Sequence, residues 1–160
     1  MGNLAVLGKI AKQLEKRPNV GGVIYFHPIT NSRLTGSART NIDIFQQICG
    51  SDFFGQVAFV TTMWNKISRG QLPRFEKLEK ELRGKLHDMT DKGTVIFQFD
   101  SNQIESVKAV LRHFAGLRRS AQLQMAREIQ KSGSSASSVR RTKAGQLIVK
   151  GMDRGLCVIL

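Results

Sequence analysis

The sequence predicts an α/β fold: a small three-layer sandwich in which about three parallel strands are flanked by helices. Three short apolar runs, at 20–26, 57–63 and 94–99, are rich in Val, Ile and Phe, as is typical of strands covered on both faces. Segments with helical periodicity separate these runs. Alternation of strand and helix is typical of parallel strands joined by right-handed crossovers.

The first elements follow from apolar spacing and from residues that end helices. A first helix is predicted before Pro18, with the apolar positions Leu4, Leu7, Ala11 and Leu14. The first strand, 20–26, comes next and leads into a polar loop over 28–37. A second helix then precedes the middle strand, with Ile42, Phe45, Ile48 and Cys49 on one face.

A third helix begins at Pro73 and has an apolar face of Phe75, Leu78, Leu82, Leu86 and Met89. Its other side is predicted to be solvated and to carry i,i+4 ion pairs, which are Glu76/Lys80, Glu79/Arg83 and Glu81/Lys85. After the last strand, Asn102 and Glu105 have the spacing of a capping box, with Asn in the Ser/Thr place. They predict a fourth helix through Phe114.

The C-terminal part is predicted to differ from the rest of the chain. We expect a basic helix from Arg118 to Lys131 and a flexible linker over the serine-rich segment 132–138. The predicted organisation is therefore one α/β domain over 1–131 and a basic flexible tail over 132–160.

Charge is concentrated toward the C-terminus. The chain has a net charge of +13, and residues 118–160 hold nine of its 25 Lys and Arg but two of its 12 Asp and Glu. Such a bias favours an anionic membrane face or nucleic-acid phosphates, or simply a solvated helix and linker. No aromatic residue follows Arg118, so bases could not stack there. Nucleic acid is the less favoured partner.

Composition bounds the class of protein. A chain of 160 residues with 41% hydrophobic residues has the size and core of one domain. No apolar run is long enough to span a bilayer, and the N-terminus lacks the features of a signal peptide. Cys49 and Cys157 are too few and too far apart for a disulfide framework. A reducing, cytoplasmic location is expected.

Three short patterns over residues 22–64 occur together. They are Val-Ile-Tyr-Phe-His-x-Ile-Thr-x-x-Arg-Leu-x-Gly-Ser, then Ile-Phe-x-x-x-Cys-Gly, and finally Val-Thr-Thr-Met-Trp. As a set they resemble the second half of fungal P-loop GTPase-like (G) domains, which are related to septin-like and immunity-associated GTPases. The resemblance covers roughly 4–146 and is weaker outside 22–64. One departure is Pro28, where that family usually has Arg. The resemblance implies a partial P-loop NTPase-like sheet.

The motif that holds phosphate in such domains is missing from this sequence. No Gly-x-x-x-x-Gly-Lys-Ser/Thr occurs, and no Mg²⁺ ligand set is recognisable, although phosphoryl transfer depends on both. We therefore expect a degenerate or truncated G-domain protein without GTPase activity of its own, which binds GTP or GDP weakly if at all. Two alternatives stay open: a fragment of a complete GTP-hydrolysing protein, and a basic, non-specific nucleic-acid-binding protein.

Candidate nucleotide-binding residues follow the second and third strands, because ligands of open α/β sheets lie at the carboxyl ends of the strands. The segment 65–68 has the spacing of the guanine-binding motif, but Ser68 stands where the motif has Asp. A serine hydroxyl cannot make the charged bidentate contact. The resemblance implies that Trp64 stacks on a base and that the loop at 100–102 offers backbone N–H groups. The candidates are Thr62, Trp64, Asn65, Lys66, Asp100 and Ser101.

Structural roles compete with each of these assignments. Trp64 is equally well explained as an aromatic at the edge of the core, and Asn65 and Lys66 as ordinary loop residues. His27, which ends the first strand, is expected on the same rim, either as a site residue or as a satisfied strand-end histidine. His87 and His113 have no partners at ligand spacing, so no metal site is predicted. Cys49 is predicted to be buried and inert.

Two features bear on partners. If Val20–Phe26 is the outer strand of the sheet, its edge invites a partner strand or self-association. The chain also ends in Cys157-Val-Ile-Leu, a C-a-a-X box whose final Leu favours geranylgeranylation of Cys157. Upstream basic residues would then supply the second signal for membrane attachment. The alternative is that 146–149 and 156–160 pair as a β-hairpin, in which case the box is a coincidence.

Overall fold

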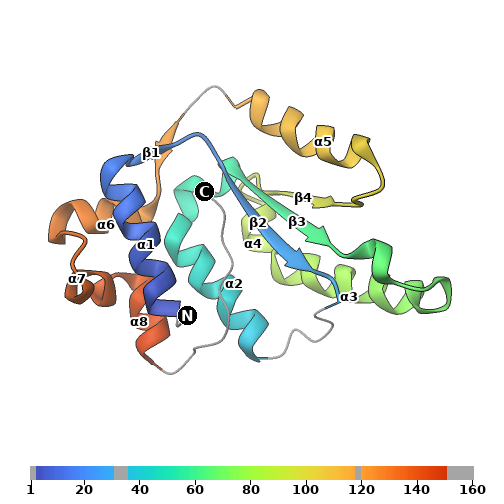
Figure 1. Ribbon diagram of the computed structural model, residues 1–160, viewed down its shortest axis with the longest axis horizontal. Helices are drawn as coiled ribbons and strands as arrows, with labels where there is room; N and C mark the ends of the chain where they lie inside the picture. The colour runs from blue at the N-terminus through green and yellow to red at the C-terminus, as the bar shows by residue number, and fades with distance from the viewer. Residues whose placement is uncertain (1–2, 31–35, 118–119, 151–160) are drawn as a thin grey trace. The chain divides into compact units, whose positions relative to one another are not determined.

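A computed structural model describes residues 3–30, 36–117 and 120–150. These residues form two compact units. The sheet unit contains the described residues of 21–34 and 54–119, and the helical unit contains those of 1–20, 35–53 and 120–157. Figure 1 shows the helices and strands of the chain. Each unit has its own buried hydrophobic residues.

The sheet unit contains a three-stranded parallel sheet. Its strands are β2 (Val23–Pro28), β3 (Val57–Thr62) and β4 (Val95–Gln98), in the order β2-β3-β4. Val23 lies opposite Val57, and Ala58 lies opposite Val95. The predicted α/β class and the three parallel strands are therefore confirmed. In the described sheet β2 is an outer strand, and it begins three residues later than the sequence predicts.

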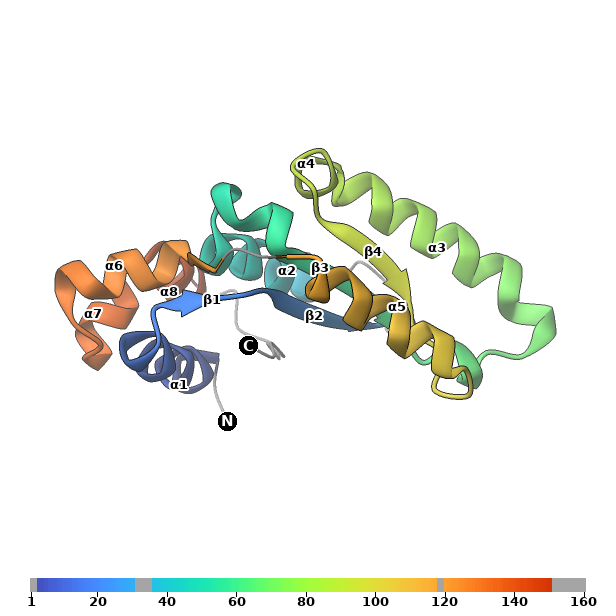
Figure 2. The same cartoon turned by 90° about the horizontal axis from the view of Figure 1, so that it is seen from above.

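Helices lie on both faces of this sheet, as Figure 2 shows for α3 (Leu72–Lys85) and α5 (Ile104–Ala115). On one face, Val110 of α5 packs on Ala58 and Val60 of β3, and the surrounding partly buried residues are Ile24, Phe26, Phe97, Phe99 and Phe114. On the other face, Glu79 of α3 bonds to Thr61 and Gln98. Alternation along the strands directs successive side chains to opposite faces. A short helix, α4 (His87–Thr90), follows α3.

Three 3₁₀ turns complete the connections: η1 (Ser51–Gln56), η2 (Trp64–Lys66) and η3 (Arg69–Gln71). The first leads into β3, and the other two lie between β3 and α3. Among the helices described in the three ranges above, none is both long and apolar enough to cross a bilayer.

The helical unit contains α1 (Asn3–Lys16), α2 (Gly36–Cys49), α6 (Gln124–Ser132), α7 (Ala136–Arg141) and α8 (Lys143–Val149). Helix α1 packs against α6, α7 and α8, and α2 packs against α6 and α8. Their shared core is mainly apolar and includes Leu7, Leu14, Phe45, Ile48, Met125, Ile129 and Val139. A short antiparallel pair, β1 (Asn19–Val20) and β5 (Ala121–Gln122), belongs to the same unit.

The serine-rich segment predicted to be a flexible linker instead leads into a capped helix. The Ser135 hydroxyl accepts a hydrogen bond from the Ser138 backbone N–H at 3.2 Å and caps α7, a role in which serine is strongly favoured. Ser138 is itself buried, and its hydroxyl donates to the Ser132 carbonyl. These hydroxyls form hydrogen bonds within the segment, whereas a flexible linker would bond to water. Residues of the predicted tail, such as Val139 and Ile148, are buried in the helical core.

Two further expectations in this region are wrong. The predicted helix from Arg118 does not begin until Gln124, because Ala121 and Gln122 pair with β1 and Leu123 is extended. Residues 146–149 lie in α8, whose Ile148 is buried, so they are not a hairpin strand. The C-a-a-X box with Cys157 lies outside the described residues.

Candidate functional site

The predicted site lies where β3 and β4 end at the same edge of the sheet. We call residues 62–66 and 99–103, which follow these strands, the rim. After Thr62 the chain turns at Met63, which has φ 68° and ψ 20°. Met63 is the only non-glycine in the described ranges with a positive φ. Such a backbone costs about 1–3 kcal/mol and persists only where the surrounding structure imposes it.

Trp64 is anchored to the strand that precedes it. Its indole N–H donates to the Thr61 hydroxyl at 3.0 Å, and that hydroxyl lies 3.2 Å from the Phe97 carbonyl of the neighbouring strand. The side chain is half-buried. This bond supports the assignment of Trp64 as an aromatic at the edge of the core, because it fixes the indole to the sheet.

The two rim loops are joined by a direct side-chain bond. The Asn65 amide donates to the Ser101 hydroxyl at 3.0 Å, and both side chains are exposed. Sequence reasoning placed these two residues at one edge, and the structure brings them into contact although they are 36 residues apart. This pair is the part of the predicted site whose members touch each other.

Asp100 orders its own loop. One carboxylate oxygen accepts the Asn102 backbone N–H at 2.9 Å, and its carbonyl accepts the Ser106 hydroxyl at 2.9 Å. This arrangement is an Asx turn, which Asp and Asn favour. The other carboxylate oxygen accepts no hydrogen bond from the described residues.

The two remaining candidates are Thr62, which is held through its backbone, and Lys66. The Thr62 carbonyl accepts the Ile29 N–H at 2.9 Å, which ties the end of β3 to the residue after β2. Lys66 is exposed, and none of the ion pairs among the described residues involves it. The rim therefore presents an ammonium, a carboxylate, an amide and a hydroxyl to solvent.

His27 lies in β2 opposite Thr61, one residue before the carboxyl end of the strand, and so at the edge of the sheet where the sequence placed it. Its ring centroid is 5.8 Å from that of Phe59, its side chain is buried, and burial lowers the pKa of the imidazole. Of the two roles left open for this residue, the structure favours the strand-end histidine.

Sequence reasoning missed a polar cluster beneath the rim that is centred on a buried carboxylate. Glu79, predicted on the solvated side of its helix, is 7% exposed. Its carboxylate accepts Gln98 Nε2 at 2.6 Å and Arg83 at 3.3 Å, and it lies 3.4 Å from the Thr61 hydroxyl that holds Trp64. A signal was present, because Glu79 stands four residues after Phe75 and three before Leu82, on the apolar stripe itself.

Two kinds of reactive site are not visible in the described ranges. They contain no group of three or more His, Cys, Asp or Glu that could hold a metal ion. Cys49 is buried in the helical unit, and burial raises the pKa of its thiol well above the usual range. A protonated, inaccessible thiol is a poor nucleophile.

No protein-family model, curated protein or solved structure matches this chain. The resemblance of residues 22–64 to G domains therefore depends on the sequence patterns alone.

Proposed function

We propose that this chain is a G-domain-like module that binds the nucleoside part of a guanine nucleotide at the rim and does not hydrolyse GTP by itself. Three parallel strands in consecutive order, with helices on both faces, are compatible with one half of a doubly wound sheet. In such sheets the ligand lies at the carboxyl ends of the strands, which is where the rim lies.

The observation that carries the proposal is the Asn65–Ser101 hydrogen bond, because it draws the loops after two neighbouring strands into one polar surface. Ser68 cannot replace the missing aspartate of the guanine motif, because one neutral hydroxyl, which here donates to Gln71 at 3.1 Å, cannot make the charged bidentate contact. Asp100, next to Ser101, supplies a carboxylate on the same surface. Its second oxygen is the acceptor we assign to the guanine N–H groups.

This arrangement predicts weak binding that does not depend on phosphate number. Most of the affinity of P-loop proteins comes from contacts to phosphate and Mg²⁺, and no phosphate loop occurs in this sequence. A few exposed hydrogen bonds to a base support a Kd of about 1 mM, equivalent to about −4 kcal/mol. GMP, GDP and GTP should therefore bind with similar affinity, and Mg²⁺ should have little effect.

The test is a titration of the full chain with GMP, GDP, GTP and AMP, followed by amide chemical shifts. We expect shifts at 62–66 and 99–103 with guanine nucleotides, and weaker shifts with AMP. Asp100→Asn keeps an acceptor for the Asx turn but removes the charge, and it should weaken GMP binding several-fold. The matched control is Asp88→Asn, which removes an exposed charge from α4.

Several outcomes would contradict the proposal. GTP that binds a hundred times more tightly than GMP in the presence of Mg²⁺ would indicate a phosphate site. Turnover of GTP that disappears in Lys66→Ala would show catalysis. If no nucleotide changes the amide chemical shifts, the chain has no nucleoside site at the rim.

The consecutive strand order also favours a second candidate, in which the same rim is the base-binding part of a complete GTP-hydrolysing protein. An in-frame Gly-x-x-x-x-Gly-Lys-Ser/Thr in the genomic sequence upstream of Met1 would decide for this candidate.

A further inference from the structure

The helical unit contains a groove between α1 and α7 that the proposed function does not use. Its volume is about 570 Å³, within the range of pockets that hold small molecules. Residues 4–12 of α1 form one wall, and residues 134–140, including most of α7, form the other.

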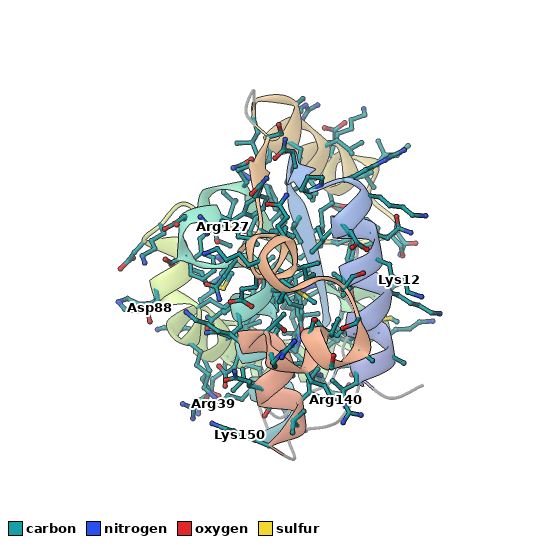
Figure 3. The ribbon with its side chains drawn as sticks, turned by 90° about the vertical axis from the view of Figure 1, so that its left-hand side faces the viewer. Lys12, Arg39, Asp88, Arg127, Arg140 and Lys150 are labelled. Carbon is teal, nitrogen blue, oxygen red and sulfur yellow. The ribbon has the colours of Figure 1, made fainter. Side chains whose placement is uncertain are left out.

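Three cations line this groove: Lys9, Lys12 and Arg140. All three are exposed, and none of the ion pairs among the described residues involves them. Figure 3 shows the side chains of Lys12 on α1 and Arg140 on α7. Several unpaired cations around one concavity raise its potential and attract an anion.

Carboxylates are few in this unit, and one of them, Glu15, bonds to a residue that lines the groove. The described residues of the helical unit contain eleven Lys and Arg but four Asp and Glu. Glu15 accepts the Ser134 hydroxyl, Asp52 pairs with Arg127 at 3.4 Å, and Glu128 accepts the Lys143 backbone N–H at 3.0 Å. The hydrogen bond from a neutral hydroxyl leaves the negative charge of Glu15 in place beside the groove, but the three lining cations outnumber this carboxylate, so the groove keeps a net positive charge.

The rest of the groove is apolar or small. Leu4, Ala5 and Val139 line it, and a Cβ added at Gly8 would meet no atom within 4 Å. The groove is thus open at Gly8 and offers apolar surface beside its cations. A ligand that fits both properties has a charged group on an apolar body.

We propose that this groove binds an amphipathic phosphate ester. Lys9, Lys12 and Arg140 hold the phosphate, for which the arginine fork is well suited, and the apolar body lies against Leu4, Ala5 and Val139. A nucleic acid fits less well, because none of the lining residues is aromatic and bases could not stack. The proposal is independent of the nucleotide site, since it concerns the other unit.

The experiment uses the full chain and a soluble short-chain phosphatidic acid, with inorganic phosphate and short-chain phosphatidylcholine as comparison ligands, by calorimetry. We expect the phosphatidic acid to bind most tightly. Lys12→Gln with Arg140→Gln should weaken it at least about tenfold, which corresponds to about 1.4 kcal/mol. The control, Lys131→Gln with Lys143→Gln, removes the same charge from exposed positions of this unit outside the groove and should change affinity less than about twofold.

A second pair of variants tests the cavity rather than the charge. Gly8→Leu places a side chain in the open groove and should abolish binding without unfolding the helix, since leucine favours helix over glycine. Gly84→Leu makes the same change in α3, where a Cβ also meets no atom within 4 Å, and should leave binding unchanged. Circular dichroism verifies that each variant is folded.

A third arm identifies the source of the ligand. Cosedimentation with phosphatidylcholine vesicles, with and without phosphatidic acid, distinguishes a lipid headgroup in a bilayer from a free phosphate ester. Binding in either arm that Gly8→Leu removes supports the site. The proposal is overturned if neither form binds, if both double variants weaken binding equally, if inorganic phosphate binds as tightly as the amphiphile, or if only an acidic peptide such as poly-glutamate binds.

Discussion

Removal of the Glu79 carboxylate should destabilise the sheet unit by more than its ion pair with Arg83 accounts for. In Glu79→Ala, Gln98 Nε2 loses an acceptor 2.6 Å away, and Arg83 loses a partner at 3.3 Å. The Thr61 hydroxyl is less affected, because the Phe97 carbonyl at 3.2 Å can still accept its proton.

The magnitude follows from how deeply each partner is buried. A hydrogen bond to a buried charged group contributes about 1.5–3 kcal/mol. The Arg83 side chain is 47% exposed, so screening limits its ion pair to about 1 kcal/mol or less. Glu79→Ala also removes the free-energy cost of burying a carboxylate, and this gain offsets part of the loss. Gln98 is itself exposed, so water can replace part of the bond that it loses. We expect a net loss of about 1.5–2 kcal/mol, against about 1 kcal/mol or less for Arg83→Ala.

Urea denaturation followed by tryptophan fluorescence measures this difference. Trp64 is the single tryptophan of the chain, and its indole donates to Thr61 within the same cluster. The signal therefore reports on the sheet unit. Glu79→Gln keeps a side-chain oxygen that can accept from Gln98, so its loss should lie between those of the other two variants.

If Arg83→Ala costs as much as Glu79→Ala, the stabilisation lies in the surface ion pair and this prediction is wrong. It is also refuted if Glu79→Ala costs less than about 0.5 kcal/mol, the range of an ordinary surface substitution.

Three further predictions concern other groups. Burial lowers the pKa of His27 below its ordinary value of 6.5, so the unfolded state binds the proton first. The stability that neutral, buried His27 contributes is complete above about pH 6.5. It is lost as the pH falls through and below that value, by up to about 1.4 kcal/mol per pH unit. His27→Phe should reduce this dependence of the unfolding free energy on pH, in denaturation measured at several pH values. Because burial raises the pKa of the Cys49 thiol, iodoacetamide should label Cys49 only after denaturation, as peptide mass spectrometry can detect. Gly145→Ala places its Cβ 2.1 Å from the Val139 carbonyl oxygen and should destabilise the protein by about 1–3 kcal/mol. Gly84→Ala places its Cβ in open space and should stabilise the protein by up to about 1 kcal/mol. Denaturation measures both changes.

Local pattern was sufficient to predict the strands of the sheet and several of the helices. The runs at 57–63 and 94–99 form β3 and β4, and Pro73 lies in the first turn of α3. These elements follow from neighbours in sequence, because apolar period and helix-terminating residues act over a few positions. The proximity of Asn65 and Ser101 could also be predicted from the sequence, because the ends of adjacent parallel strands lie at one edge of the sheet.

The expectations that failed depend on contacts between distant residues. Ala121 and Gln122 are strand rather than helix because they pair with Asn19 and Val20. The serine-rich segment is ordered because Ser135 caps a helix whose Val139 is buried in the helical core. Propensity carries no information about either partner, so tertiary context overrides it.

The α/β class, the parallel strands and the places where candidate polar residues follow them could all be predicted from the amino-acid sequence, because they depend on local periodicity. Three other features come from tertiary contacts: the burial of Glu79, the hydrogen bond that fixes Trp64 to Thr61, and the groove with unpaired cations between α1 and α7. Burial and pairing of charges depend on which distant surfaces meet, and the free energy of those contacts is not encoded in any short segment of the chain.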